Sequence, residues 1–217
     1  MNYSVLTDIG RARSQNQDAV FATDEAVGSL PNLFVVADGM GGHKAGEYAS
    51  NQAIALVKRE VASDTESEPV QIINQGITTA NNRIYEEAAQ DATKSGMGTT
   101  MVVATIFDHH MCVGNVGDSR LYVYREGQLQ QITQDHSLVG ELVRAGLLTP
   151  EEARLHPRRN IITRALGTEG DNTPDLLAAD IRPGDRFLLC TDGLTGMVRD
   201  DDIERTLLDS QTIDQAA

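Results

Sequence analysis

The sequence lacks the features that place a protein in a membrane or outside the cell. None of the apolar runs in its 217 residues is long enough to cross a bilayer. Its first residues, MNYSVLTD, lack the basic start and apolar block of a signal peptide. The only two cysteines, Cys112 and Cys190, lie in separate apolar stretches and form no C-x-x-C pair. We therefore expect a soluble cytoplasmic protein with both thiols reduced in the core and no membrane partner.

Positive charge is also scarce. The chain has 18 Lys and Arg against 32 Asp and Glu, which gives a formal net charge of −14. This balance argues against a nucleic-acid partner, because sequence-independent binding needs cations that neutralise phosphates. The acidic residues could instead bind cations or simply solvate the surface, and composition alone does not decide between these roles. With 40% hydrophobic residues, the chain is long enough for one globular domain.

Hydrophobic patterning predicts a mixed α and β fold. Residues 3–7 alternate like a strand, and residues 19–21 form a short core strand after a polar loop. Small or apolar residues recur at a four-residue spacing over 45–61 and again over 73–88, which predicts two helices that pair antiparallel. Closely spaced strands then follow, joined by short turns that are typical of an antiparallel meander. These strands are expected over residues 101–107, 110–116, 120–124 and 128–132.

A long segment without strand character follows, over residues 135–167. It contains a predicted helix at 138–145 and a second helix start at Thr149-Pro150, where a Thr cap precedes an N1 proline. Its basic residues stand out in an acidic chain: Arg154, Arg158 and Arg159. Charge alone is compatible with a solvated helical insertion or with a mobile element that meets an anionic partner. A further helix is predicted over 200–211, with acidic residues in its first turn.

Two apolar runs each deliver a carboxylate followed by glycine. The first reaches Asp38-Gly39 and the second Asp192-Gly193, so both aspartates are predicted to stand at strand ends. Gly39 would let the backbone approach a bound group, with its carbonyl beside the Asp38 carboxylate. A single Asp-Gly is usually an ordinary cap, but two buried strand-end carboxylates would repel each other unless a cation or proton lay between them. Carboxylate and carbonyl oxygens suit Mg²⁺ or Mn²⁺.

Two further aspartates lie next to strands, Asp18 before residues 19–21 and Asp118 in a tight turn. The set of motifs around these carboxylates is specific, and with it the chain resembles the metal-dependent protein phosphatases of the type 2C class, in their bacterial single-domain form. The resemblance runs from the first predicted strand to the end of the sequence. The matching segments are Arg13-x-x-Asn16-x-Asp18, VADGMGGH (36–43), GTT (98–100), GDSR (117–120), DHS (135–137), TRALG (163–167) and LCTDGL (189–194).

The resemblance implies an α+β fold, a four-layer α-β-β-α sandwich in which two mainly antiparallel sheets are flanked by helix pairs. It also implies a metal centre at one end of the sandwich, holding two Mn²⁺ or Mg²⁺ ions and a third, weaker one. By this resemblance Asp38 bridges two ions, Asp18 and the Gly39 carbonyl serve one of them, and Asp192 serves the other. Asp118, with Asp192, would hold the third.

The resemblance assigns the substrate side as well. Arg13 would clamp the substrate phosphate, so that Arg13 and Asp38 are the expected catalytic residues. Residues 137–165 would form a flap subdomain within a catalytic domain that spans residues 1–217. The flap makes Arg154, Arg158 and Arg159 candidates for substrate contact.

The expected chemistry needs no side-chain nucleophile. Two cations roughly 4 Å apart lower the pKa of a bridging water and orient it for in-line attack on phosphorus. The lack of a G-x-S-x-G elbow is therefore no objection. The expected function is a serine/threonine phosphoprotein phosphatase, monomeric, acting on the targets of a bacterial protein kinase. The alternatives are a pseudophosphatase that only binds phosphoproteins and a hydrolase of small phosphate esters.

Two departures from the family pattern affect these expectations. Met40 stands where many eukaryotic relatives have a His that is a proposed general acid, so a metal-bound water or His43 would take that role, unless His43 is a packed or surface residue. The family also ends in an Asp-Asn motif on a last strand, whereas this sequence stops at Ala217, and Asp171-Asn172-Thr173 is interpreted as a decoy. The expectation is a chain truncated before its last strand, with one weak metal site and low activity.

Overall fold

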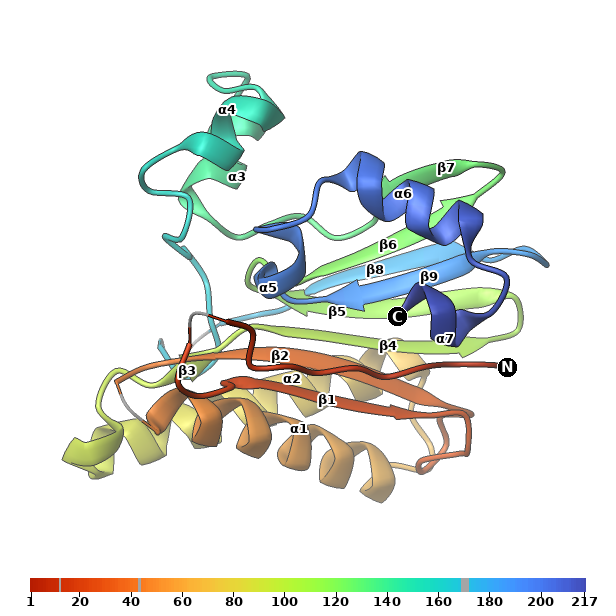
Figure 1. Ribbon diagram of the computed structural model, residues 1–217. Coiled ribbons are helices and arrows are strands. Elements are labelled where there is room, and N and C mark those ends of the chain that lie inside the picture. The colour runs from red at the N-terminus through yellow and green to blue at the C-terminus, as the bar shows by residue number, and fades with distance from the viewer. Residues whose placement is uncertain (12, 43, 169–171) are drawn as a thin grey trace.

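The structure is a computed structural model that describes residues 1–11, 13–42, 44–168 and 172–217. Two antiparallel sheets are stacked between helices (Figure 1). The larger sheet has the strand order β1-β2-β4-β5-β8, with the two-residue strand β3 also paired to β2. Its strands are β1 (Asp18–Thr23), β2 (Leu33–Met40), β3 (Gly98–Thr99), β4 (Met101–Phe107), β5 (His110–Val116) and β8 (Asp175–Asp180). The smaller sheet has the order β7-β6-β9 and consists of β6 (Arg120–Arg125), β7 (Gln128–Gln131) and β9 (Arg186–Cys190).

Two long helices, α1 (Ala45–Ser63) and α2 (Pro69–Gln90), cover the outer face of the larger sheet (Figure 1). Their apolar faces are the ones that the four-residue spacing predicts, since Ala53, Val57 and Ile77 are fully buried. The short loop 64–68 makes the two helices antiparallel neighbours. They pack on the sheet so closely that a Cβ at Gly114 of β5 would lie 2.5 Å from Cδ1 of Ile77.

Three hydrophobic clusters separate four layers. The first lies between the α1–α2 pair and the larger sheet, and the second, with Val36, Val102 and Leu121, lies between the two sheets. The third joins the smaller sheet to α6 (Asp200–Asp209) through Tyr124 and Leu207. The expected α-β-β-α sandwich is therefore confirmed. The short helix α7 (Ile213–Ala216) follows α6.

The expected four-stranded meander is wrong in one respect. β4 pairs with β5 and β6 with β7, as predicted, but β5 and β6 belong to different sheets. The free edge of β5 is taken by β8, and that of β6 by β9. The chain changes sheets at Gly117, whose φ of +104° and contact with Thr100 leave no room for a side chain.

The N-terminal prediction is also wrong. Residues 1–9 form no strand, although the ring of Tyr3 packs edge-on against Phe34 of β2 with centroids 6.0 Å apart. Elements that the pattern did not predict include β3, β8 and the 3-10 helix Ala92–Lys94. Both cysteines are buried and unpaired, as predicted.

The segment 137–165, here called the flap, carries two short helices that protrude from the sandwich (Figure 1). They are α3 (Leu138–Arg144) and α4 (Pro150–Leu155). Thr149 caps α4 in a capping box with Glu152, which confirms the helix start predicted there. Among the described residues, no helix is both long and apolar enough to span a membrane.

Candidate active site

The site begins where β1 and β2 run side by side. Asp18 and Asp38 are direct partners in the antiparallel register, so their side chains are cross-strand neighbours. One oxygen of Asp18 accepts a 2.7 Å hydrogen bond from the hydroxyl of Thr191, the residue before Asp192. This hydrogen bond brings the segment that carries Asp192 next to Asp18 and Asp38. Asp18, Asp38, Asp118 and Asp192 are called the carboxylate cluster below.

The predicted strand ends differ in detail from the structure. β2 does not end at Asp38 but continues through Gly39 to Met40, because Gly39 and Met40 pair with β3. Asp192 follows β9 as the first residue of a short helix, α5 (Asp192–Thr195), and its side chain is exposed. The two Asp-Gly sequences therefore serve different local structures, although they deliver carboxylates to one site.

The glycine after Asp38 is required by packing. A Cβ at Gly39 would lie 2.0 Å from the carbonyl oxygen of Gly46 in the first turn of α1 and 2.8 Å from that of Gln17. The amide of Gly39 donates to the same Gln17 carbonyl at 3.0 Å. The sequence predicts that Gly39 lets the backbone approach a bound group. In the described structure, the group that approaches Gly39 closely is helix α1.

Thr100 holds Asp38 and Asp118 in a fixed relation. Its hydroxyl accepts from the Asp38 amide at 2.9 Å and shares a 2.7 Å hydrogen bond with the hydroxyl of Ser119. Its own amide donates to the Asp38 carbonyl at 2.9 Å. This geometry gives the Gly98-Thr99-Thr100 motif a role that sequence reasoning missed. Thr191 was missed in the same way, since only the fold brings its hydroxyl to Asp18.

Asp38 and Asp118 are affected electrostatically by the carboxylates around them. The pKa of Asp38 is raised to about 9, first by burial and then by the charges of Asp18 and Asp192, a hydrogen bond with Asp192, and the charge of Asp118. Burial likewise raises the pKa of Asp118 to about 7, together with the charges of Asp192 and Asp135. Such shifts mean that the cluster cannot carry its full negative charge without a proton or a cation.

A divalent cation fits this cluster chemically. Asp118 is buried, and its Oδ1 atom has no hydrogen-bond partner among the described residues. An orphaned buried carboxylate oxygen beside other carboxylates is a ligand set of hard oxygen donors. In the described ranges, no three Asp, Glu, His or Cys side chains meet the requirements of a preformed metal site. The fit is therefore one of charge and donor type, and not of a closed ligand cage.

The predicted arginines differ in their exposure and contacts. Arg13 is exposed in the loop before β1, and Arg158 and Arg159 are exposed on the flap. Arg154 is half-buried, and its Nη1 donates to the carbonyls of Thr195 at 2.9 Å and Val198 at 3.2 Å. That nitrogen of Arg154 therefore binds the segment after Asp192.

Three remaining positions complete the predicted site. Met40 is half-buried at the end of β2 and has no proton to donate. His43, the alternative acid, and Asp171 of the Asp171-Asn172-Thr173 segment lie outside the described residues. The neighbouring Asn172 is buried, and its side-chain amide donates to the Ala165 carbonyl at 2.7 Å.

Comparison with known proteins finds extensive similarity. The profile of the protein phosphatase 2C family matches residues 10–213. The serine/threonine phosphatase stp of Listeria monocytogenes is 39% identical over 100% of this chain and 87% of its own length. The crystal structure of the serine/threonine phosphatase Stp1 from Staphylococcus aureus superimposes with a TM-score of 0.88 at 38% identity, over 100% of this chain and 88% of that one.

A third similar structure contains metal. It is the catalytic domain of the serine threonine protein phosphatase PstP in complex with two manganese ions, with a TM-score of 0.86 and 33% identity over 99% of this chain and 87% of that one. The family profile covers nearly the whole sequence, and the similar structures share its fold over almost all of this chain. From this combined evidence, the chain belongs to the protein phosphatase 2C family.

Proposed function

We propose that the carboxylate cluster and the Gly39 carbonyl hold the divalent cations, manganese or magnesium, of a serine/threonine protein phosphatase. The enzyme class follows from the family, since its members are metal-dependent hydrolases of phosphoproteins, and the relatives are named serine/threonine phosphatases. The assignment of individual residues is supported by one observation above all. The Oδ1 atom of Asp118 is buried without a hydrogen-bond partner among the described residues, and the Asp118 carboxylate interacts electrostatically with those of Asp38 and Asp192, so a cation would balance it.

The proposed division of labour among ligands uses the positions of the residues. Asp38 is central, because its pKa responds to the charges of all three other members of the cluster. It is suited to bridge two ions, with Asp18 and the Gly39 carbonyl on one side and Asp192 on the other. Asp118, whose pKa responds to the charge of Asp192, would share a third ion with it. The two manganese ions in PstP support manganese as a cofactor of that relative.

Bound divalent cations activate water and offset the negative charge of a phosphoryl group in transfer. The chain's own residues keep the ligands in place: Thr100 fixes the backbone of Asp38, and Thr191 orients Asp18. Arg13 offers a planar fork that can bind two phosphate oxygens, which would orient the phosphate for in-line attack. The exposed Arg158 and Arg159 would contact the protein that carries the phosphate.

The wider setting is also part of the proposal. The substrates would be proteins phosphorylated by a serine/threonine kinase, so the chain would act in signal transduction, in the cytoplasm and as a monomer. Residues 137–165 would act as a flap subdomain that contributes arginines to substrate binding. Of the three flap arginines, Arg158 and Arg159 suit this role best, because Nη1 of Arg154 is occupied by backbone carbonyls.

Hydrolysis of a phosphothreonine peptide tests the proposal. The chain is assayed with Mn²⁺, with Mg²⁺ and with chelator, beside its Asp38→Ala variant. Asp180→Ala is the control, because Asp180 lies on β8 with a side chain that is 82% exposed. We expect metal-dependent turnover that Asp38→Ala abolishes and Asp180→Ala preserves. Peptide binding without turnover under any metal would contradict the proposal and indicate a pseudophosphatase. Turnover of small phosphate esters alone would indicate a general hydrolase.

A further inference from the structure

Two sequence motifs have no role in the site described so far. They are Asp135-His136-Ser137 and residues 163–167, and they lie at the two ends of the flap. The structure pairs these ends. Ser137 and Ile162 form an isolated antiparallel bridge, flanked by hydrogen bonds of 2.9 Å from the Thr163 amide to the His136 carbonyl and from the Leu138 amide to the Ile161 carbonyl. These paired ends, residues 136–138 and 161–164, are called the neck.

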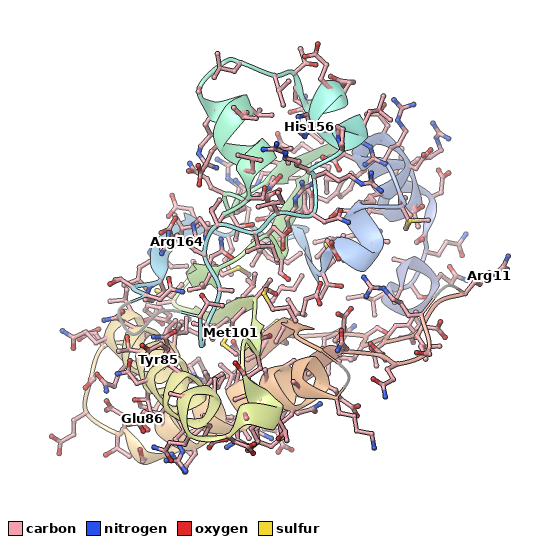
Figure 2. The ribbon with its side chains drawn as sticks, turned by 90° about the vertical axis from the view of Figure 1, so that its left-hand side faces the viewer. Arg11, Tyr85, Glu86, Met101, His156 and Arg164 are labelled. Carbon is pink, nitrogen blue, oxygen red and sulfur yellow. The ribbon has the colours of Figure 1, made fainter. Side chains whose placement is uncertain are left out.

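One carboxylate holds both sides of the neck. Asp175, the first residue of β8, lies 2.9 Å from Nε2 of His136 through Oδ2 and 2.7 Å from Nη1 of Arg164 through Oδ1. Arg164 also donates to the carbonyl of Thr173. In Figure 2, Arg164 lies at the foot of the flap, with His156 on the flap above it. The flap is therefore attached to the larger sheet at its base, through an ion pair and a histidine.

The histidine continues this connection to the carboxylate cluster. Nδ1 of His136 accepts a 3.0 Å hydrogen bond from the Gly117 amide, and the His136 amide donates to the Gly117 carbonyl at 3.0 Å. Since Nδ1 is an acceptor, the ring proton of the neutral imidazole is on Nε2, where it donates to Asp175. Nη1 of Arg164 also lies 2.9 Å from Nε2, but with the proton there both nitrogens are donors, so Asp175 is the group that binds them both. Burial and the charge of Arg164 lower the pKa of His136 despite the hydrogen bond with Asp175, which favours this neutral form.

The result is a continuous set of contacts from β8 to the site. Asp175 orients His136, His136 binds both backbone polar groups of Gly117, and Gly117 precedes Asp118. The side chain of His136 is only 5% exposed, so solvent does not easily replace these bonds. The same carboxylate thus fixes the direction of the flap and supports the turn that carries Asp118.

We propose that Asp175 is a positioning residue for protein substrates, which holds the neck so that the flap arginines face a phosphoprotein bound at the carboxylate cluster. This inference rests on the proposed function. A phosphopeptide long enough to reach the flap depends on that geometry, whereas a small aryl phosphate does not. Loss of Asp175 therefore affects the two kinds of substrate differently.

Asp175→Asn is the sharpest variant. His136 and Arg164 approach different oxygens of Asp175, and Asn keeps an oxygen at only one of these two positions, with a donating NH₂ group at the other. If the Asn oxygen faces His136, its NH₂ group faces the Arg164 guanidinium, so that two hydrogen-bond donors oppose each other. The bond of His136 to Gly117 is then kept while the other side of the neck is released.

The control variant is Asp180→Asn. Asp180 ends the same strand and also contacts a histidine, His110, through a 3.0 Å hydrogen bond, but its side chain is 82% exposed. KM and kcat are measured with Mn²⁺ for a phosphothreonine peptide and for p-nitrophenyl phosphate. We expect Asp175→Asn to raise the peptide KM about tenfold, since a charge-assisted hydrogen bond is lost. Turnover of p-nitrophenyl phosphate by Asp175→Asn should stay within about twofold, because a small aryl phosphate does not depend on the flap geometry. All constants of Asp180→Asn should also stay within about twofold, because an exposed ion pair contributes little.

Two results would overturn the inference: an unchanged peptide KM in Asp175→Asn, or an equal loss on both substrates. Asp175→Glu, which restores the charge, is expected to recover part of the peptide KM. A wild-type chain without metal-dependent turnover would count against the proposed function instead. In that event trypsin cleavage after Arg158 and Arg159 still tests the neck, with faster cleavage expected in Asp175→Asn than in Asp180→Asn. Equal cleavage rates would then overturn the inference.

Discussion

Replacing Gly39 with alanine tests why the residue after the central aspartate is glycine. The added Cβ would lie 2.0 Å from the Gly46 carbonyl oxygen and 2.5 Å from its carbonyl carbon, both backbone atoms of α1. Since a side-chain rotation cannot relieve this contact, α1 or β2 must move by roughly 1.4 Å to reach an ordinary separation near 3.4 Å. Overpacking of this kind typically costs about 1–3 kcal/mol.

The expected result is a lower melting temperature of the metal-free chain. For a domain of this size, each kcal/mol corresponds to about 2–4 °C, so Gly39→Ala should lower the Tm by roughly 2–12 °C. Gly42→Ala is a matched control from the same glycine-rich stretch, because a Cβ at Gly42 has no atom within 4 Å. The assay is thermal denaturation followed by circular dichroism in chelator. Equal melting temperatures for the two variants would refute the packing argument.

Two further predictions concern the carboxylate cluster. Thr191→Val removes the 2.7 Å hydrogen bond to Asp18 and should weaken Mn²⁺ binding about tenfold, as loss of a group that orients a ligating carboxylate typically does. Thr191→Ser should bind Mn²⁺ as the wild type does. Equal Mn²⁺ affinities of all three proteins in calorimetry would contradict this role. Because the folded-state pKa of Asp118 is raised to about 7 and that of Asp38 to about 9, the metal-free folded chain binds more protons than the unfolded chain above pH 4. Stability in chelator should therefore fall as pH rises from 5 to 9. A melting temperature that rises over this pH range would refute the linkage.

Local patterns predicted the elements whose residues bury a regular face. The predicted strands 101–107 and 110–116 match β4 and β5, because apolar runs bounded by turn residues mark buried strands clearly. The four-residue spacing likewise found α1 and α2. The pattern failed where tertiary pairing decides the structure: it could not assign β5 and β6 to different sheets, and a two-residue strand such as β3 has no periodicity to detect.

The candidate site was predictable to a similar degree. The repeated Asp-Gly and the family resemblance named all four aspartates, and the fold brings them into electrostatic contact. The residues that hold them were not predictable, because Thr191 meets Asp18 across most of the chain length and Asp175 meets His136 through a strand that the pattern did not reveal. Residues 3–7 show the opposite error, since their alternation is real but finds no partner strand.

Calorimetric titration of Mn²⁺ into the metal-free chain is the most direct test of the central claim, that the carboxylate cluster holds divalent cations. Wild type, Asp38→Ala and Asp180→Ala are compared at one pH and ionic strength. The account predicts saturable binding by wild type and Asp180→Ala, and loss of the tightest site in Asp38→Ala, because Asp38 is the carboxylate that all the others influence. Unchanged Mn²⁺ binding by Asp38→Ala would contradict the account.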